Sequence, residues 1–117
     1  MVDCIESYGY SKSLMSELSG YQIPQSLNVG IIGLKTSMID WNKLEEWIVV
    51  MERREGTSYY LEQALSAMIF SKHKTMALDR NCYLVNPLPE QPKSTLHHYV
   101  STSKKEYFNS EWKRILA

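Results

Sequence analysis

The feature of the sequence that most constrains the fold is the apolar run at residues 27–34, LNVGIIGL. Its β-branched side chains and its lack of charge are typical of a strand that is covered on both faces. Pro24 before the run, and Gly30 and Gly33 within it, favour a strand over a piece of buried helix. We therefore expect residues 27–34 to form the central strand of the core. A glycine there indicates either a kinked core strand or a ligand that approaches the backbone beside Asn28.

Two amphipathic helices are predicted after this run. The first spans residues 40–55, with Asp40 as its N-cap and Gly56 directly after its end. Its apolar residues recur at i, i+3, i+4 and i+7, which places them on one face: Leu44, Trp47, Ile48 and Met51. The second helix starts after Gly56, with Thr57 or Ser58 as its cap, and runs to about residue 71 with a buried stripe of its own.

Strands are predicted in the second half of the chain, at residues 75–79, 82–86 and 95–100. The last of these carries two adjacent histidines, His97 and His98. Adjacent side chains on a strand point to opposite faces, so a single site takes only one of the two unless the strand bulges.

The order of the predicted elements defines the fold class. A short helix at residues 11–18, with Ser11 or Ser13 as its cap and Gly20 as its stop, precedes the central strand. An amphipathic tail at residues 101–117 is expected to dock on the domain. Helices and strands in this order predict an α/β protein in which flanking helices cover a mixed sheet. We expect one domain over residues 1–117.

Composition excludes several classes of function. The 13 Lys and Arg residues balance the 13 Asp and Glu residues, whereas a binder of nucleic acid or of anionic membranes needs a basic excess. Cys4 and Cys82 lie far apart without the spacing of a zinc site, which indicates reduced thiols. No apolar run approaches the roughly 20 residues that cross a bilayer, and no export signal is visible. We therefore expect a cytoplasmic protein with no membrane span and no nucleic-acid partner.

Three short motifs follow one another along the chain: Asn28 and Gly30 in the apolar run, Glu62 and Gln63 at a helix start, and His98 six residues before Lys104. Taken in order, these motifs resemble the C-terminal half of a nucleotide-sugar glycosyltransferase of the GT-A kind, in its glycogenin-like and galactosyltransferase-like branch. The resemblance covers about residues 21–112, but only the second half of the family's catalytic domain. The predicted fold is then the acceptor-side half of such a domain.

The resemblance implies substrates and a role for each matching residue. The substrates are a nucleotide sugar and a glycan or another hydroxyl acceptor. Asn28 and Gly30 would line the sugar and acceptor pocket. Glu62 or Gln63 would be the catalytic residue that holds the donor sugar or the acceptor hydroxyl. The structural alternative for Glu62 is a carboxylate that is favoured by the helix dipole alone.

The resemblance also implies a metal site. His98 would bind a divalent cation, and one nitrogen among oxygen ligands suits manganese. Lys104 would bind the diphosphate, whose negative charge grows as the glycosidic bond breaks. The family's paired DxD carboxylates are absent, because Asp3, Asp40 and Asp79 are all isolated. We therefore expect a glycosyltransferase-like fragment that binds the metal weakly and is inactive alone.

The main alternative is a small α/β binding or protein-interaction domain without catalysis, in which the histidines and the lysine have structural roles. A partial domain would expose the sheet edge at which its missing strands belong, and this edge would allow self-association.

Overall fold

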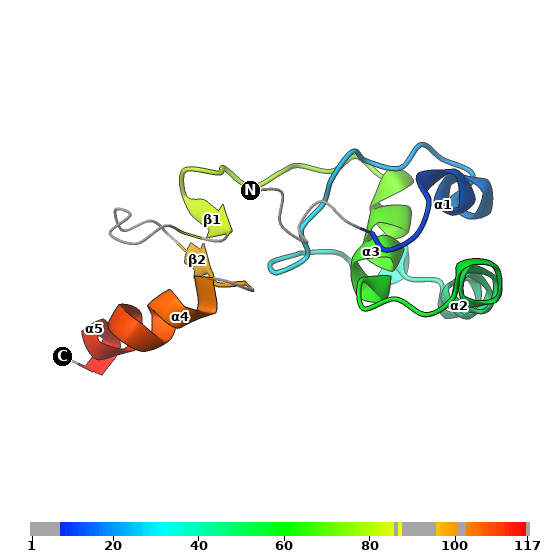
Figure 1. The fold of residues 1–117 in the computed structure, drawn as a ribbon. Helices are drawn as coiled ribbons and strands as arrows, with labels where there is room; N and C mark the ends of the chain where they lie inside the picture. Colours follow the sequence, from blue (N-terminus) through cyan, green and yellow to red (C-terminus); the bar gives the residue numbers. More distant parts are fainter. Residues whose placement is uncertain (1–7, 86, 88–95, 101–102, 117) are drawn as a thin grey trace. The chain divides into compact units, whose positions relative to one another are not determined.

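The computed structural model describes residues 8–85, 87, 96–100 and 103–116. The chain divides after Thr75 into two compact units, and each is described by itself (Figure 1). We call the described part up to Thr75 the helical unit and the part after it the C-terminal unit. The predicted single domain with a docking tail at residues 101–117 stays a prediction.

The helical unit contains the α-helices α1 (Lys12–Ser19), α2 (Trp41–Glu55) and α3 (Leu61–Ser71), with the 3-10 turn η2 (Thr36–Met38) before α2. The predicted ends of α1 and α2 are confirmed. The Ser11 hydroxyl caps α1, and Gly20 ends it with a φ of 77°. Asp40 Oδ1 accepts a hydrogen bond of 3.1 Å from a backbone N–H in the first turn of α2, and Gly56 follows the last turn. These local signals act within one turn of the helix.

The predicted start of α3 is wrong, because the helix begins at Leu61 rather than directly after Thr57 or Ser58. The Ser58 hydroxyl instead accepts a hydrogen bond of 3.1 Å from the Tyr60 N–H. A serine side chain that bonds the backbone two residues later closes a turn, which delays the helix.

The core of the helical unit lies where the apolar faces of the helices meet. Met15 of α1, Met51 of α2 and Met68 of α3 are completely buried, and burial of each such side chain stabilises the fold by roughly 1.5–3 kcal/mol. Trp47 is 3% exposed, which confirms the predicted buried face of α2. Ala64 and Ala67 are buried on α3 and allow neighbouring elements to pack closely.

Two tyrosines at the start of the helical unit complete this core. Tyr8 and Tyr10 are 3% and 8% exposed. The Tyr8 hydroxyl donates a hydrogen bond of 2.9 Å to the Pro24 carbonyl, and burial raises the pKa of Tyr8 to about 12. This bond ties the segment after α1 to the core, together with Ile23, which is 5% exposed.

The predicted central strand is wrong. Residues 27–34 form an irregular loop, in which the Gly30 N–H donates a hydrogen bond of 2.9 Å to Asn28 Oδ1. Ile31 and Ile32 are 38% and 39% exposed, so the middle of the run does not lie in the core. A strand needs a neighbouring strand for its backbone hydrogen bonds, whereas the helical unit packs helix faces against one another.

The C-terminal unit contains two short strands. β1 (Tyr83–Val85) and β2 (Leu96–His98) pair in parallel, with Val85 opposite His98. They confirm the strands predicted at residues 82–86 and 95–100, within shorter bounds. The helical turns α4 (Lys104–Glu106), η4 (Tyr107–Glu111) and α5 (Trp112–Leu116) follow one another directly (Figure 1). Of these, η4 is a π-helical turn. We call residues 104–116 the C-terminal helix.

The strand predicted at residues 75–79 is wrong, because this segment is irregular. Asp79 instead begins the turn that leads into β1. Its carbonyl accepts hydrogen bonds from the N–H groups of Cys82 and Tyr83, at 3.0 and 2.8 Å, and its Oδ1 accepts one of 2.9 Å from the Asn81 N–H. An aspartate that bonds the backbone two residues later is a turn former, and this local bond prevails over strand propensity.

The helices and the parallel sheet of two strands among the described residues are compatible with the predicted α/β class. The finer expectation, a mixed sheet with flanking helices like the acceptor-side half of a glycosyltransferase, stays a prediction.

An acid-dependent link between α2 and α1 carries the first testable prediction. The Ser11 hydroxyl and the Ser11 N–H both donate to the Glu55 carboxylate and hold the pKa of Glu55 below its ordinary value. A carboxylate with a lowered pKa in the folded state stabilises the fold above its unfolded pKa, and this contribution is lost as pH falls through the folded pKa. Glu55→Gln is therefore expected to lower the melting midpoint near pH 7 and to leave it little changed near pH 2.

The measurement is a series of thermal melts followed by circular dichroism, and the quantity that decides is the midpoint difference between the variant and the parent at each pH. Glu45→Gln, at an exposed position of the same helix, is the control and should give no such trend. A constant difference for Glu55→Gln from neutral to acid pH would contradict the role of its charge.

Candidate functional site

The predicted pocket residues Asn28 and Gly30 lie in the exposed loop of the helical unit. The Asn28 side chain is half-buried, and its Oδ1 is already bonded to the Gly30 N–H. An asparagine that bonds the backbone two residues later forms an Asx turn, which explains the N-x-G spacing as turn chemistry. A role of these residues in binding a sugar stays a prediction.

Glu62 and Gln63 lie in the first turn of α3 but differ in their surroundings. The Glu62 side chain is exposed, whereas Gln63 is 7% exposed and packs within the helical unit. Successive residues on a helix point in different directions. The two side chains therefore do not form one pair at one site, and the catalytic role of either residue stays a prediction.

His98 and Lys104 lie in the C-terminal unit. His98 is half-buried on β2, and Lys104 is exposed at the start of α4. Ser103, 5% exposed, closes the turn before α4, because its hydroxyl accepts from the Val100 N–H and donates to the Val100 carbonyl, both at 2.8 Å. The resemblance implies that His98, rather than His97, lies beside Asn28 in one site. Asn28 belongs to the other unit, so this proximity stays a prediction.

Among the described residues, no group of three His, Cys, Asp or Glu residues is placed so that it could hold a metal ion. The predicted manganese site at His98 therefore stays a prediction. The neighbouring histidine of β2, His97, takes part in an aromatic contact. Its Nδ1 lies 3.3 Å from the Tyr99 hydroxyl, and its buried Nε2 has no hydrogen-bond partner among the described residues.

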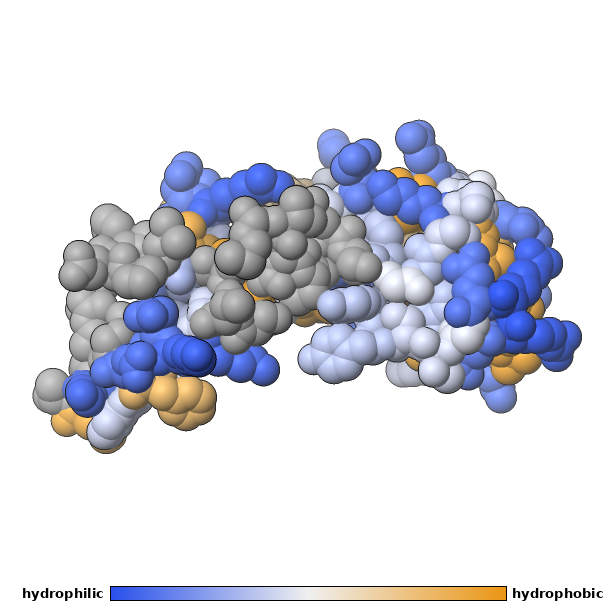
Figure 2. Space-filling view, viewed as in Figure 1, coloured by the Kyte–Doolittle hydropathy of each residue, from blue (hydrophilic) through white to orange (hydrophobic). Residues whose placement is uncertain are grey.

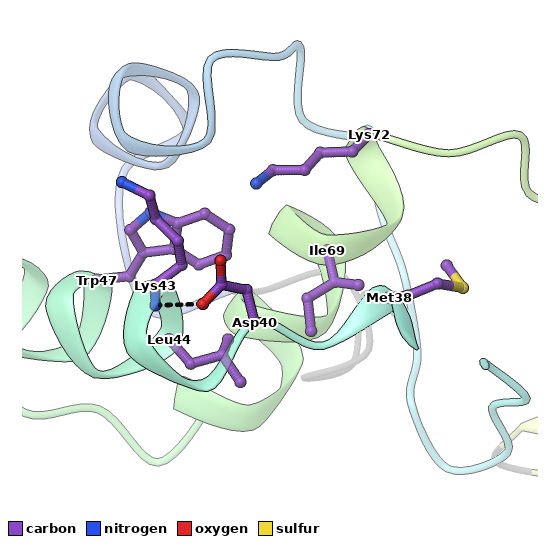
Figure 3. A pocket seen from close by; sticks show the side chains of 7 residues that line it. All are labelled: Met38, Asp40, Lys43, Leu44, Trp47, Ile69 and Lys72. Carbon is purple, nitrogen blue, oxygen red and sulfur yellow. Dashed lines mark hydrogen bonds between the residues drawn. The ribbon is translucent and has the colours of Figure 1, made fainter. Parts of the chain in front are cut away.

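A small hollow lies beside the first turns of α2 (Figure 3). Lys72 Nζ lies 4.6 Å from the centre of the Trp47 ring, and the Asp40 carboxylate is used as the cap of α2. The enclosed space is about 10 Å³, which is room for about one water molecule. Pockets for small ligands are typically roughly 300–1,000 Å³, so this hollow is too small for a substrate.

The C-terminal helix carries an apolar stripe that faces solvent. Phe108, Trp112 and Leu116 are spaced four residues apart and are 68%, 40% and 77% exposed. Residues four apart lie on the same face of a helix, so the three side chains form one row. We call these three residues the apolar stripe. Figure 2 shows hydrophobic side chains at the surface of this helix beside hydrophilic ones.

A chain of aromatic rings determines which face of the C-terminal helix is outward. The ring of His97 on β2 lies 6.0 Å from that of Tyr99, which lies 5.7 Å from that of Tyr107. Tyr107 therefore contacts the segment after β2. The neighbouring Phe108, whose ring is 5.4 Å from that of Tyr107, is left exposed with the rest of the stripe.

Lysines border the stripe. Lys104 and Lys105 are exposed at the start of the C-terminal helix, and Lys113 Nζ lies 5.9 Å from the centre of the Trp112 ring.

The sequence pattern indicated an amphipathic tail, but predicted that its apolar face is covered. The sequence signal for the stripe was its spacing of four residues, and its exposure could not be obtained from that spacing.

Comparison of the chain with family models, with curated proteins and with solved structures finds no match. Among the described residues, no helix combines the length and the apolar character needed to cross a membrane.

Proposed function

We propose that this chain is a non-catalytic protein-interaction module, whose C-terminal helix binds in an apolar groove with an acidic rim on a partner protein. The observation that carries the proposal is the exposed apolar stripe of Phe108, Trp112 and Leu116. An amphipathic helix that binds in a groove presents its anchors at such spacings. Large aromatic side chains are also the residues that contribute most to binding at protein interfaces.

The charge beside the stripe supports an acidic rim. Lys104, Lys105 and Lys113 are exposed on the C-terminal helix, although the chain as a whole is neutral. Complementary charges at the rim of an interface speed association and fix orientation, while the buried apolar anchors contribute most of the affinity. The groove is therefore expected to be apolar at its centre and lined with carboxylates at its border.

The ring contacts support a helix that is positioned before binding. Tyr107 packs against Tyr99, so the segment after β2 holds the C-terminal helix with its stripe outward. A helix that is already formed and oriented loses less conformational entropy on binding than a disordered segment does.

The test uses calcium-loaded calmodulin as a probe, because its groove has this chemistry: methionine-rich at the centre and acidic at the border. Titration calorimetry of the whole chain should give a dissociation constant in the micromolar range, about −8 kcal/mol, with a negative heat-capacity change from apolar burial. Phe108→Ala and Trp112→Ala should each weaken binding about tenfold or more, which corresponds to roughly 1.4 kcal/mol.

Trp41→Ala is the matched control, since Trp41 is 74% exposed on the helical unit and lies outside the stripe. Removal of calcium, which closes the groove, should abolish binding by the parent chain. Failure to bind the open groove, or equal losses for Trp41→Ala and Trp112→Ala, would contradict the proposal. Tighter binding of the stripe to anionic lipid vesicles than to the groove would assign it to a membrane surface instead.

The glycosyltransferase-like function stays a prediction, with a nucleotide sugar and manganese as its ligands and His98 and Lys104 as the residues that bind them. Stabilisation of the chain by manganese with a nucleoside diphosphate, lost in both His98→Ala and Lys104→Ala, would favour it over the interaction module.

A further inference from the structure

The C-terminal helix changes its hydrogen-bond pattern within the apolar stripe. The Trp112 N–H donates to the Tyr107 carbonyl, five residues back, at the end of the π-helical turn η4. In an α-helix the same N–H donates to the carbonyl four residues back, which here is that of Phe108. Single π-helical turns within α-helices are rare and are frequently found at functional sites. This turn contains Phe108 and ends directly before Trp112, so it lies at two of the three residues of the stripe.

The side chain of Trp112 binds the carbonyl that its own backbone N–H passes over. The indole Nε1–H of Trp112 donates a hydrogen bond to the Phe108 carbonyl. Side chains on a helix lean toward its N-terminus, so the indole ring lies over the preceding turn, where this carbonyl is. The backbone N–H and the indole N–H of Trp112 are therefore both bonded within the C-terminal helix.

The ring of Trp112 consequently offers apolar surface to a partner. Trp112 is 40% exposed, and the indole N–H is the one polar group of its side chain. A tryptophan that becomes buried usually finds an acceptor for this N–H, and a buried donor without an acceptor costs free energy. Here the helix itself supplies the acceptor. Trp112 is therefore able to enter a pocket that has no acceptor without this cost.

We propose that Trp112 determines the specificity of the C-terminal helix, because its ring enters a wholly apolar pocket that offers no hydrogen-bond acceptor. This inference rests on the proposed function, which supplies the groove. The bond between Trp112 and Phe108 orients the ring before binding, which lowers the entropy cost of burying it.

The internal bond also disfavours the wrong partners. A pocket with a carbonyl or a carboxylate at its floor would lose the water on that acceptor and gain no donor from Trp112, which costs free energy. The carboxylates of the groove are therefore expected at its border, beside the lysines, and not within the pocket for Trp112.

The first measurement follows the indole N–H groups of the whole chain by heteronuclear NMR. The indole N–H of Trp112 should exchange with solvent about tenfold or more slowly than that of Trp41, because its hydrogen bond must open first. Trp41 is the matched reference, since it is 74% exposed on the helical unit. The signal of Trp112 is identified as the one that is missing in Trp112→Phe.

The second measurement replaces Trp112 by benzothienylalanine, in which a sulfur takes the place of the N–H and the ring keeps its size. Calcium-loaded calmodulin is the probe, and titration calorimetry of the whole chain gives the affinity. The dissociation constant should stay within about threefold of that of the parent, because the internal bond is absent from the free and the bound variant alike and its loss cancels. A pocket that bonds the indole N–H would instead lose about tenfold or more in affinity, since its acceptor is left unpaired. The same replacement at Trp41 is the control and should leave the affinity unchanged.

Two results would overturn the inference while the proposed function stands. One is an indole N–H of Trp112 that exchanges as fast as that of Trp41. The other is a parent chain that binds the open groove and a benzothienylalanine variant that loses more affinity than the expected range. A parent chain that does not bind the open groove would contradict the proposed function, and the pocket for Trp112 would be rejected with it.

Discussion

Trp47→Ala is expected to destabilise the helical unit by about 3–5 kcal/mol. Trp47 is 3% exposed and packs in the core of the helical unit, so its removal leaves a cavity that the neighbouring side chains fill only in part. The Lys72 ammonium, 4.6 Å from the ring centre, also loses its cation–π contact. Since small domains have about 5–15 kcal/mol of stability in total, the loss is a large share.

Urea unfolding followed by circular dichroism measures this effect, because the signal does not rely on tryptophan fluorescence. Trp41→Ala makes the same chemical change on the same helix at a position that is 74% exposed, and should alter stability by less than about 0.5 kcal/mol. Trp47→Phe keeps part of the buried volume and should fall between the parent and the alanine variant, so the comparison survives if Trp47→Ala does not fold. Equal midpoints for Trp41→Ala and Trp47→Ala would show that the buried face of α2 is assigned incorrectly.

Gly9→Ala is expected to destabilise the helical unit by about 2–4 kcal/mol, through backbone strain and crowding together. Gly9 has a φ of 69°, in the left-handed region that residues with a Cβ rarely adopt. A Cβ built there lies 1.8 Å from Ser58 Oγ and 2.8 Å from Ser58 Cβ, so Ser58 must move. Its hydrogen bond from the Tyr60 N–H, which closes the turn before α3, would then be lost.

The loop that carries Gly9 cannot easily shift, because Tyr8 and Tyr10 on either side of it are buried in the core. Gly33→Ala is the control. Gly33 lies outside the left-handed region, and a Cβ built there has no neighbouring atom within 4 Å, so alanine should be neutral or slightly stabilising. Chemical unfolding of the two variants side by side measures the difference. A Gly9→Ala variant as stable as Gly33→Ala would contradict the close approach of Ser58.

Some features of the candidate sites depend on the local sequence, and others depend on the tertiary structure. The spacing of Phe108, Trp112 and Leu116 was visible in the sequence as an amphipathic tail, because side chains four apart share a helix face whatever surrounds them. Their exposure depends on which other parts of the chain cover the helix. For the loop of residues 27–34, the composition indicated a preference for a strand. The composition does not show whether another strand lies beside this segment to pair with it.

What the sequence by itself determined is the set of local features: α1 with Ser11 or Ser13 as its cap and Gly20 after it, α2 between Asp40 and Gly56, and the buried face of α2 at Trp47. Caps and helical periodicity act over one or two turns, so they need no knowledge of the rest of the fold. Only the tertiary structure decided that residues 27–34 remain an exposed loop. A strand exists only where another strand, distant in sequence, pairs with its backbone, and no local pattern states whether that partner is present.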